Sequence, residues 1–471
     1  MPKSVYAFVL FILFLLTYST ISTSVYSIEP TDLGLVSELP LTFWIGLVLL
    51  GSLWYFCQNS QKCQIAALVL TVSYLFVAPA IIRIPVWLST SYYPFGESVL
   101  INQTGHLVDR PNMIFITYHE WPAFLYLASM FTLVTGMSHH ILLKFFPLLT
   151  IALYGLLVFL ILRVKLKTSY AIMGATWFLS SFFLRQHYFG PPGISYIFFL
   201  LIALVLSWLF FDEKVKKAKL EVLFLVLFAV TTFTHALTSF VAFILVVALY
   251  LSHRLIKKGR PPVTARLCLF SGVILLSYNV YVASRFFTVT LKTFFQIFFE
   301  GKPLGIYLES ARIFGSMANR LSYTSYVGIV LLNVVVGLIS IIQVFKTVRS
   351  REQTVNKRYS LFWVILLIML GLFAFTAEYG PHEAYQRAFM FGLVPLVYLC
   401  INVLKRKPKI LLAILVGLLF LNVPAQYGGD SYTLATNTQL AGARFFAEYT
   451  PQNIICFHEF SLYVRYHDPQ K

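Results

Sequence analysis

The sequence predicts an all-α, polytopic transmembrane helical bundle, and three observations lead to this fold class. Hydrophobic residues make up 59% of the 471 residues and charged residues only 11%, and the mean hydropathy is +0.78, values far outside those of soluble globular domains. Apolar runs of roughly 20 residues, long enough to cross about 30 Å of hydrocarbon, recur along almost the whole chain. These runs are continuous in Leu, Ile, Val and Phe, a pattern that favours helices over the alternating strands of membrane barrels.

About thirteen spans follow from these runs. The first is interpreted as an uncleaved anchor, because its apolar run is long and no A-x-A cleavage site follows it. We expect residues 1–424 to form one transmembrane module and residues 425–471 a short extracytoplasmic C-terminal tail with a helix-like run at 436–449. The predicted spans are 5–24, 41–56, 64–83, 140–162, 168–185, 192–211, 220–235, 238–253, 267–285, 322–345, 360–377, 386–404 and 409–424.

Clusters of Lys and Arg lie at every second turn between spans, and by the positive-inside rule those turns face the cytoplasm. The net charge of +18 therefore belongs to membrane-proximal turns, so the lipid bilayer is the expected partner of these cations and nucleic acid is not. The acidic residues are distributed the other way. Of 18 acidic residues, only four lie on the cytoplasmic side, which leaves 14 outside; the four are Asp212, Glu213, Glu221 and Glu352.

One apolar segment, residues 121–137, is predicted not to cross the membrane. If it crossed, every basic cluster downstream would move to the outer side, and the segment is short and opens with Trp121 and Pro122. We interpret it as a helix lying in the outer interface. Residues 84–139 then form one continuous first outer loop with interfacial helices. Residues 285–322, where pairs of Phe alternate with polar residues, form a second outer loop.

Several short motifs resemble the GT-C superfamily. These are polytopic glycosyltransferases that use polyprenyl-phosphate sugars, and they include protein mannosyltransferases, aminoarabinose transferases and oligosaccharyltransferase catalytic subunits; the likeness is to an archaeal branch. The resemblance covers roughly residues 85–400. The motifs are Gln103-Thr104-Gly105-His106, Tyr118-His119-Glu120-Trp121-Pro122-Ala123, Val134-Thr135-Gly136, Arg185-Gln186-His187-Tyr188-Phe189-Gly190-Pro191 and Glu383-Ala384-Tyr385-Gln386-Arg387-Ala388-Phe389.

The resemblance implies a multi-pass enzyme of the cell membrane that moves a sugar from a polyprenyl-phosphate donor to a glycan, protein or lipid acceptor on the extracytoplasmic face. Such transfer needs a base near the acceptor hydroxyl. The superfamily usually places a catalytic Asp near the start of the first outer loop, where this chain offers only Glu97. Glu97 and Glu120 are therefore the predicted catalytic residues. Glu120 or Asp109 is predicted to hold the acceptor or a divalent cation, which would be the cofactor, and His119 or His106 to assist in binding substrate.

The leaving phosphate needs cations on the same face, since Arg engages phosphate oxygens bidentately. The outer end of the fifth span offers Arg185 with His187, and the outer end of the twelfth offers Arg387 with neighbouring residues His382 and Glu383. The loop acids Glu97, Glu120 and Asp109 also have a simpler interpretation, as solvated carboxylates. Arg387 has one too, as a side chain that reaches the lipid headgroups. His235, in a tight outer turn, is interpreted as a hydrogen-bonded turn residue.

Two other classes of protein stay open. A lipid or sugar transporter or flippase would show ionisable residues within its spans and inverted repeats, and the span centres here are almost free of charge. A non-catalytic, degenerate membrane scaffold would explain the missing Asp directly. The sequence shows no zinc-ligand spacing, and no disulfide is expected, because Cys57 and Cys63 would face the reducing cytoplasm. Asn102-Gln103-Thr104 is a short glycosylation sequon on the outer side.

Overall fold

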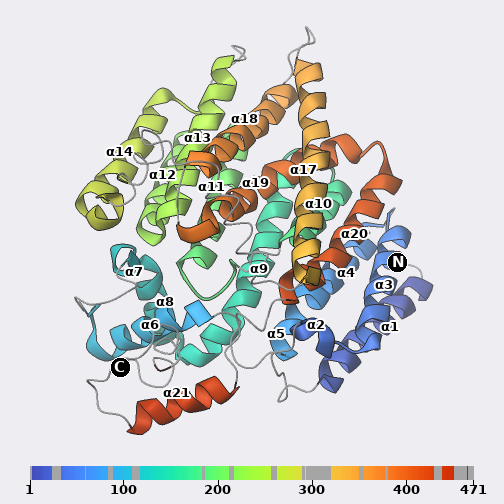
Figure 1. Ribbon diagram of the computed structural model, residues 1–471. Helices are drawn as coiled ribbons and strands as arrows, with labels where there is room; N and C mark the ends of the chain where they lie inside the picture. Colours follow the sequence, from blue (N-terminus) through green and yellow to red (C-terminus); the bar gives the residue numbers. More distant parts are fainter. Residues whose placement is uncertain are drawn as a thin grey trace.

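The computed structural model is a bundle of α-helices (Figure 1). Among the described residues, nine helices are long and apolar enough to cross a membrane and three shorter ones are also apolar, and no strand occurs. The all-α polytopic prediction is therefore confirmed. The structure describes residues 3–23, 33–58, 60–82, 89–108, 117–182, 186–211, 217–255, 262–288, 292, 320–348, 355–376, 380–428, 437–449 and 464.

Every predicted span contains a described helix. The N-terminal helices are α1 (Lys3–Ser22), the short α2 (Leu35–Glu38), α3 (Leu41–Phe56), and α4 (Gln61–Val72), which continues through a π-helical turn, η1 (Ser73–Val77), into α5 (Ala78–Ile82). The remaining long helices are α9 (His139–Arg163), α10 (Thr168–Ser181), α11 (Pro191–Phe211), α12 (Lys217–Thr234), α13 (Ala236–Leu255), α14 (Ala265–Tyr281), α17 (Arg320–Val348), α18 (Val355–Thr376), α19 (Gly380–Leu404) and α20 (Pro408–Tyr427).

The N-terminal helices pack closely because of one glycine. Helix α1 packs on α3, and the buried Tyr74 hydroxyl donates a hydrogen bond of 3.1 Å to the carbonyl of Ile12. A Cβ atom added to Gly46 of α3 would lie only 1.9 Å from the Tyr74 hydroxyl oxygen. Any side chain at position 46 would therefore displace this tyrosine.

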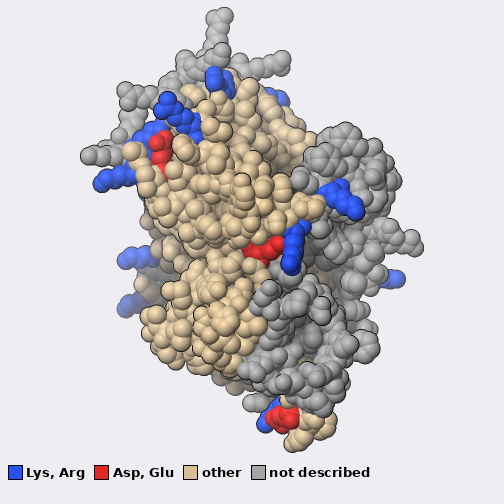
Figure 2. Space-filling view, turned by 90° about the vertical axis from the view of Figure 1, so that its left-hand side faces the viewer, with Lys and Arg blue, Asp and Glu red and all other residues tan. Residues whose placement is uncertain are grey.

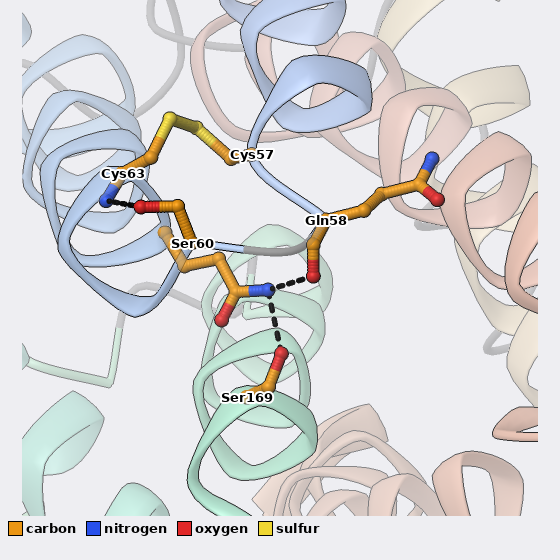
Figure 3. The surroundings of a disulfide bond; sticks show 6 residues. Cys57, Gln58, Ser60, Cys63 and Ser169 are labelled. Atoms are coloured by element: carbon orange, nitrogen blue, oxygen red, sulfur yellow. Dashed lines mark hydrogen bonds between the residues drawn. A yellow bond between two sulfur atoms is a disulfide. The ribbon is translucent and has the colours of Figure 1, made fainter. Parts of the chain in front are cut away.

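The turn between α3 and α4 holds a disulfide between Cys57 and Cys63 (Figure 3). The expectation of no disulfide is wrong for this pair, because the compact turn brings the two Cα atoms to 5.1 Å. In the same turn, Gln64 donates from its amide to the Gln58 carbonyl at 3.0 Å and to the Ser169 hydroxyl of α10 at 2.6 Å. Gln64 thus closes the turn and also links it to α10.

Buried polar side chains join the spans at the centre of the bundle. The indole N–H of Trp177 donates to Asn333 at 2.8 Å, and the amide of Asn333 donates to Ser181 at 3.0 Å, which links α10 to α17. The amide of Asn422 in α20 donates to the carbonyl of Ser180 at 3.0 Å. Such hydrogen bonds hold transmembrane helices together where water cannot compete.

Basic residues from different turns meet at one end of α11. The ammonium of Lys165 lies 5.3 Å from the ring centre of Phe211, and the guanidinium of Arg358 lies 5.9 Å from that of Phe210. Figure 2 shows a group of Lys and Arg side chains near the top of the molecule and others at mid-height and near the bottom. The turns that carry Lys165 and Arg358 therefore lie beside the same end of α11.

The first outer loop folds into a small helical layer at the other end. It contains the 3₁₀ turn η2 (Ser89–Ser91), α6 (Tyr92–Thr104), α7 (Thr117–Glu120) and α8 (Ala123–Thr135), and α21 (Asn437–Tyr449) from the C-terminal tail lies beside it (Figure 1). These elements share an apolar core with the start of α9 and with Phe189, just before α11. That core contains Tyr92, Tyr93, Phe95, Ile101, Phe124, Leu125, Ala128, Leu142, Leu143, Phe146, Phe189, Leu440, Ala443, Ala447 and Val464.

Helix α8 has the length and the surface expected of an interfacial helix. Its 13 residues span about 20 Å at 1.5 Å per residue, well short of the roughly 30 Å of a bilayer core. One face, with Phe124 and Leu125, is buried against α6, whereas Met130 and Val134 on the other face are exposed. The helix thus presents an apolar face outward, as expected of an interfacial helix.

Candidate functional site

Glu97 lies on α6 inside the apolar core of the first outer loop. Its side chain is only 1% exposed, and Tyr93 and Phe95 of the same helix are also buried. The helix ends at Gly105, whose φ of 77° places it in the left-handed region that glycine adopts without strain. A carboxylate buried in this way is costly unless it is paired.

One partner of Glu97 is His119 of α7. Nε2 of His119 lies 3.6 Å from Oε2 of Glu97, and the imidazole is 11% exposed. The Tyr93 hydroxyl lies 3.4 Å from the same nitrogen, and the rings of Tyr93 and Tyr118 pack at 5.1 Å. The structure therefore brings two of the predicted site residues together, as a buried carboxylate behind a partly exposed imidazole.

Tyr93 was missed in the sequence analysis, although the signal was available. Tyr93 and Glu97 are four residues apart, so in a helix their side chains lie on the same face.

Glu120 follows His119 directly but makes a separate set of contacts. Its Oε1 accepts a hydrogen bond from the backbone N–H of Arg285 at 3.2 Å, and its Oε2 accepts one from that of Phe286 at 3.3 Å. Burial raises the pKa of Glu120, while the two amides and the charge of Arg285 act in the opposite direction. Glu120 is thus bonded to the start of the second outer loop.

Arg387 of α19 forms part of a buried hydrogen-bond chain. Its Nη1 lies 3.3 Å from Nε2 of His235, Nδ1 of His235 lies 2.9 Å from the Thr238 hydroxyl, and that hydroxyl lies 3.0 Å from the hydroxyl of Ser195. The backbone N–H of Thr238 also donates to Nδ1 of His235 at 3.3 Å, so both ring nitrogens have polar partners. Burial, and then the charge of Arg387, hold the pKa of His235 well below its ordinary value, which favours the neutral ring. The contact of His235 with Arg387 goes beyond the turn role predicted for it.

A small packed cluster connects the two polar groups. Trp121, two residues after His119, belongs to the same buried cluster as Ala236, which directly follows His235. The segments that carry His119 and His235 thus contribute to one apolar cluster.

Of the other predicted site residues, His187 has a described side chain, and it packs elsewhere. His187 is 1% exposed and packs against the rings of Phe76 and Phe182 at 5.6 and 5.9 Å between ring centres. Asp109 and Arg185 lie outside the described residues. His382 and Glu383 lie in the first turn of α19, where the structure describes the backbone only. Most of the second outer loop, from 293 to 319, also lies outside the described residues.

A divalent cation would draw on the same side chains. Glu97 and His119 offer one carboxylate and one imidazole, whereas metal sites in proteins usually use three or more such ligands. In the part of the chain that the structure describes, no group of three or more His, Cys, Asp or Glu side chains is placed to hold a metal ion. The described residues therefore do not assemble a complete protein-ligand set.

Two solved structures of the oligosaccharyltransferase of Archaeoglobus fulgidus are similar to this chain. The form in complex with zinc and sulfate is 15% identical, with a TM-score of 0.45 over 78% of this chain, and the apo form is 13% identical, with a TM-score of 0.49 over 84%. The chain spans 52% and 59% of the length of those two chains. No family model and no curated protein matches. The archaeal enzyme is of a kind that the sequence resemblance named, but a likeness at this level assigns no activity to the chain.

Proposed function

We propose that this protein is a membrane glycosyltransferase that moves a sugar from a polyprenyl-phosphate donor to an acceptor on the extracytoplasmic face of the cell membrane. The observation that supports the proposal best is the contact of 3.6 Å between Glu97 and His119, in which Glu97 is 1% and His119 is 11% exposed. A buried carboxylate behind a more accessible imidazole is suited to proton transfer at the edge of a site.

In the proposed reaction, the pair acts as the base. Glu97 holds the proton of His119 on Nε2, which leaves Nδ1 as the nitrogen that accepts the proton of an acceptor hydroxyl. The acceptor oxygen forms a new bond to the anomeric carbon of the sugar. The bond from that carbon to the phosphate oxygen breaks, and its electron pair leaves with the lipid phosphate.

The cation proposed for the leaving phosphate is Arg387. Its side chain is 8% exposed, and it is the only Lys or Arg among the described residues that is buried. A guanidinium in a site of low polarity stabilises developing negative charge more strongly than one in water. His235 lies 3.3 Å from Nη1, and as an uncharged imidazole it would orient the guanidinium without cancelling its charge.

The polyprenyl chain of the donor would lie in the bilayer, and the acceptor would be a glycan, a protein or a lipid. The apolar face of α8, with Met130 and Val134 exposed, would place the first outer loop at the membrane surface. A donor phosphate at headgroup depth would then be within reach of that loop.

The test is sugar transfer from a radiolabelled polyprenyl-phosphate sugar by the purified full-length chain in lipid. Glu97→Gln and His119→Gln should each lower the rate by roughly 10²- to 10⁴-fold, the usual contribution of a general base. Glu448→Gln is the matched control, because Glu448 is a half-exposed carboxylate paired with Arg444 on α21, and it should keep the wild-type rate. Wild-type transfer by both Glu97→Gln and His119→Gln would remove this pair from the reaction.

A further inference from the structure

The two oxygens of Glu120 are held by consecutive backbone amides. Arg285 N–H bonds to Oε1 and Phe286 N–H bonds to Oε2, at 3.2 and 3.3 Å. A carboxylate presents two acceptor oxygens side by side, so it matches two neighbouring amide donors. Glutamine offers one such oxygen and alanine offers none, so this arrangement uses the carboxylate itself.

The backbone of Glu120 is held from the same side. The Tyr278 hydroxyl of α14 donates to the carbonyl of Glu120 at 2.6 Å. The next residue, Trp121, packs edge-on against Phe286 with ring centres 4.9 Å apart, and against Tyr278 at 6.4 Å. We call these five residues, Glu120, Trp121, Tyr278, Arg285 and Phe286, the outer clasp.

The outer clasp joins two segments that are far apart in sequence. On one side is the end of α7, which carries His119, and on the other is the end of α14, where the second outer loop begins. Because His119 directly precedes Glu120, any movement of Glu120 moves the peptide that carries the imidazole. A position set to within about 0.5 Å matters for a proton acceptor.

We propose that Glu120 is a positioning residue that fixes His119 against Glu97, and that it is not a reacting carboxylate. The proposal deepens the proposed function of the Glu97–His119 pair and rests on it. It also changes the role given to Glu120 in the sequence analysis, from catalysis to orientation. The reason is that both carboxylate oxygens face the backbone amides of Arg285 and Phe286, whereas a base must present an oxygen to the substrate.

The first measurement is hydrogen exchange at the amides of Arg285 and Phe286 in the full-length chain. Glu120→Ala should speed exchange of both amides by roughly tenfold or more, because each loses a charged acceptor. Glu120→Gln, which keeps one oxygen, should have a smaller effect. Glu448→Gln, the exposed control on α21, should leave both amides unchanged.

The second measurement follows His119 itself, through its rate of modification by diethyl pyrocarbonate. Loosening the clasp should raise this rate several-fold in Glu120→Ala. Tyr278→Phe, which removes only the bond to the carbonyl of Glu120, should raise it as well. Tyr278→Phe also keeps the proposal testable if Glu120→Ala does not fold.

The third measurement separates a positioning role from a catalytic one. It compares the rates at which Glu120→Gln and Glu120→Ala transfer sugar from a labelled polyprenyl-phosphate donor. A positioning role predicts that Glu120→Gln retains clearly more activity than Glu120→Ala, with losses mainly in kcat. Equal, near-complete loss in both variants, with amide exchange and His119 reactivity as in wild type, would make Glu120 a reacting group and overturn the proposal.

Unchanged amide exchange in Glu120→Ala would also overturn it. If the wild-type chain transfers no sugar, the proposed function fails, but the exchange and modification experiments still decide whether the outer clasp holds His119.

Discussion

Replacing His235 tests the buried chain around Arg387 directly. In His235→Ala, Nη1 of Arg387 loses its hydrogen-bond partner at 3.3 Å, and the Thr238 hydroxyl loses its partner at 2.9 Å. A hydrogen bond to a charged group contributes about 1.5–3 kcal/mol and a neutral one about 1 kcal/mol. We therefore expect His235→Ala to lower the free energy of unfolding by about 2.5–4 kcal/mol. His235→Gln, which can still accept from the guanidinium, should lose less.

The assay is unfolding of the full-length chain by titration with sodium dodecyl sulfate from mixed micelles, followed by tryptophan fluorescence. The control is Thr264→Ala. It removes the hydroxyl that caps the N-terminus of α14 and leaves the hydrogen bonds around Arg387 intact. A loss in His235→Ala of under about 0.5 kcal/mol, the size of an ordinary surface substitution, would refute the reasoning.

The same histidine predicts a pH dependence. Burial and the charge of Arg387 hold the folded-state pKa of His235 well below its ordinary value, whereas its pKa in the unfolded chain is about 6.5. The stability that neutral His235 contributes is thus fully present above that pH and is lost as the pH falls from there toward the folded-state pKa. His235→Gln should abolish this part of the acid destabilisation. An identical pH profile in wild type and His235→Gln would contradict the assignment of a neutral ring.

Three further predictions concern other parts of the chain. Gly46→Ala should destabilise the protein by about 1–3 kcal/mol through overpacking. Adding Tyr74→Phe to that variant should partly restore stability, because it removes the hydroxyl oxygen that lies 1.9 Å from the new Cβ. Equal stability of the single and double variants would argue against that contact. Cys57 and Cys63 should resist alkylation until the protein is reduced, as read by mass spectrometry, and ready labelling without reductant would exclude the disulfide. Asn102 should carry no glycan despite its sequon, because its amide donates to Thr132 at 2.9 Å between α6 and α8; a glycan found there by mass spectrometry would contradict this packing.

Much of the fold was readable from the sequence because membrane helices have a strong local signal. Apolar runs give their positions, and each predicted span contains a described helix. The basic turns predict that residues 121–137 stay out of the membrane, and the structure has a helix of 13 residues there, α8. The disulfide between Cys57 and Cys63 was missed for a different reason. The spacing of the two cysteines permits a disulfide in a compact turn. The prediction that this turn faces the reducing cytoplasm argued against one.

The site was only partly readable, because its contacts depend on tertiary structure. The sequence placed Glu97 and His119 in one loop, but it could not place them 3.6 Å apart, since 22 residues separate them. The link from Arg387 to His235 crosses 152 positions and has no local pattern. The partners of Glu120 are backbone amides, which every residue except proline possesses, so no side-chain signal could have revealed them.

The most direct test of the account is a double-mutant cycle on Glu97 and His119, measured as single-turnover sugar transfer from a labelled polyprenyl-phosphate sugar. Residues that act as one unit are strongly non-additive. If the pair acts together as the base, Glu97→Gln combined with His119→Gln should be no slower than the slower single variant. Losses that multiply in the double variant, or full activity in Glu97→Gln, would contradict the account.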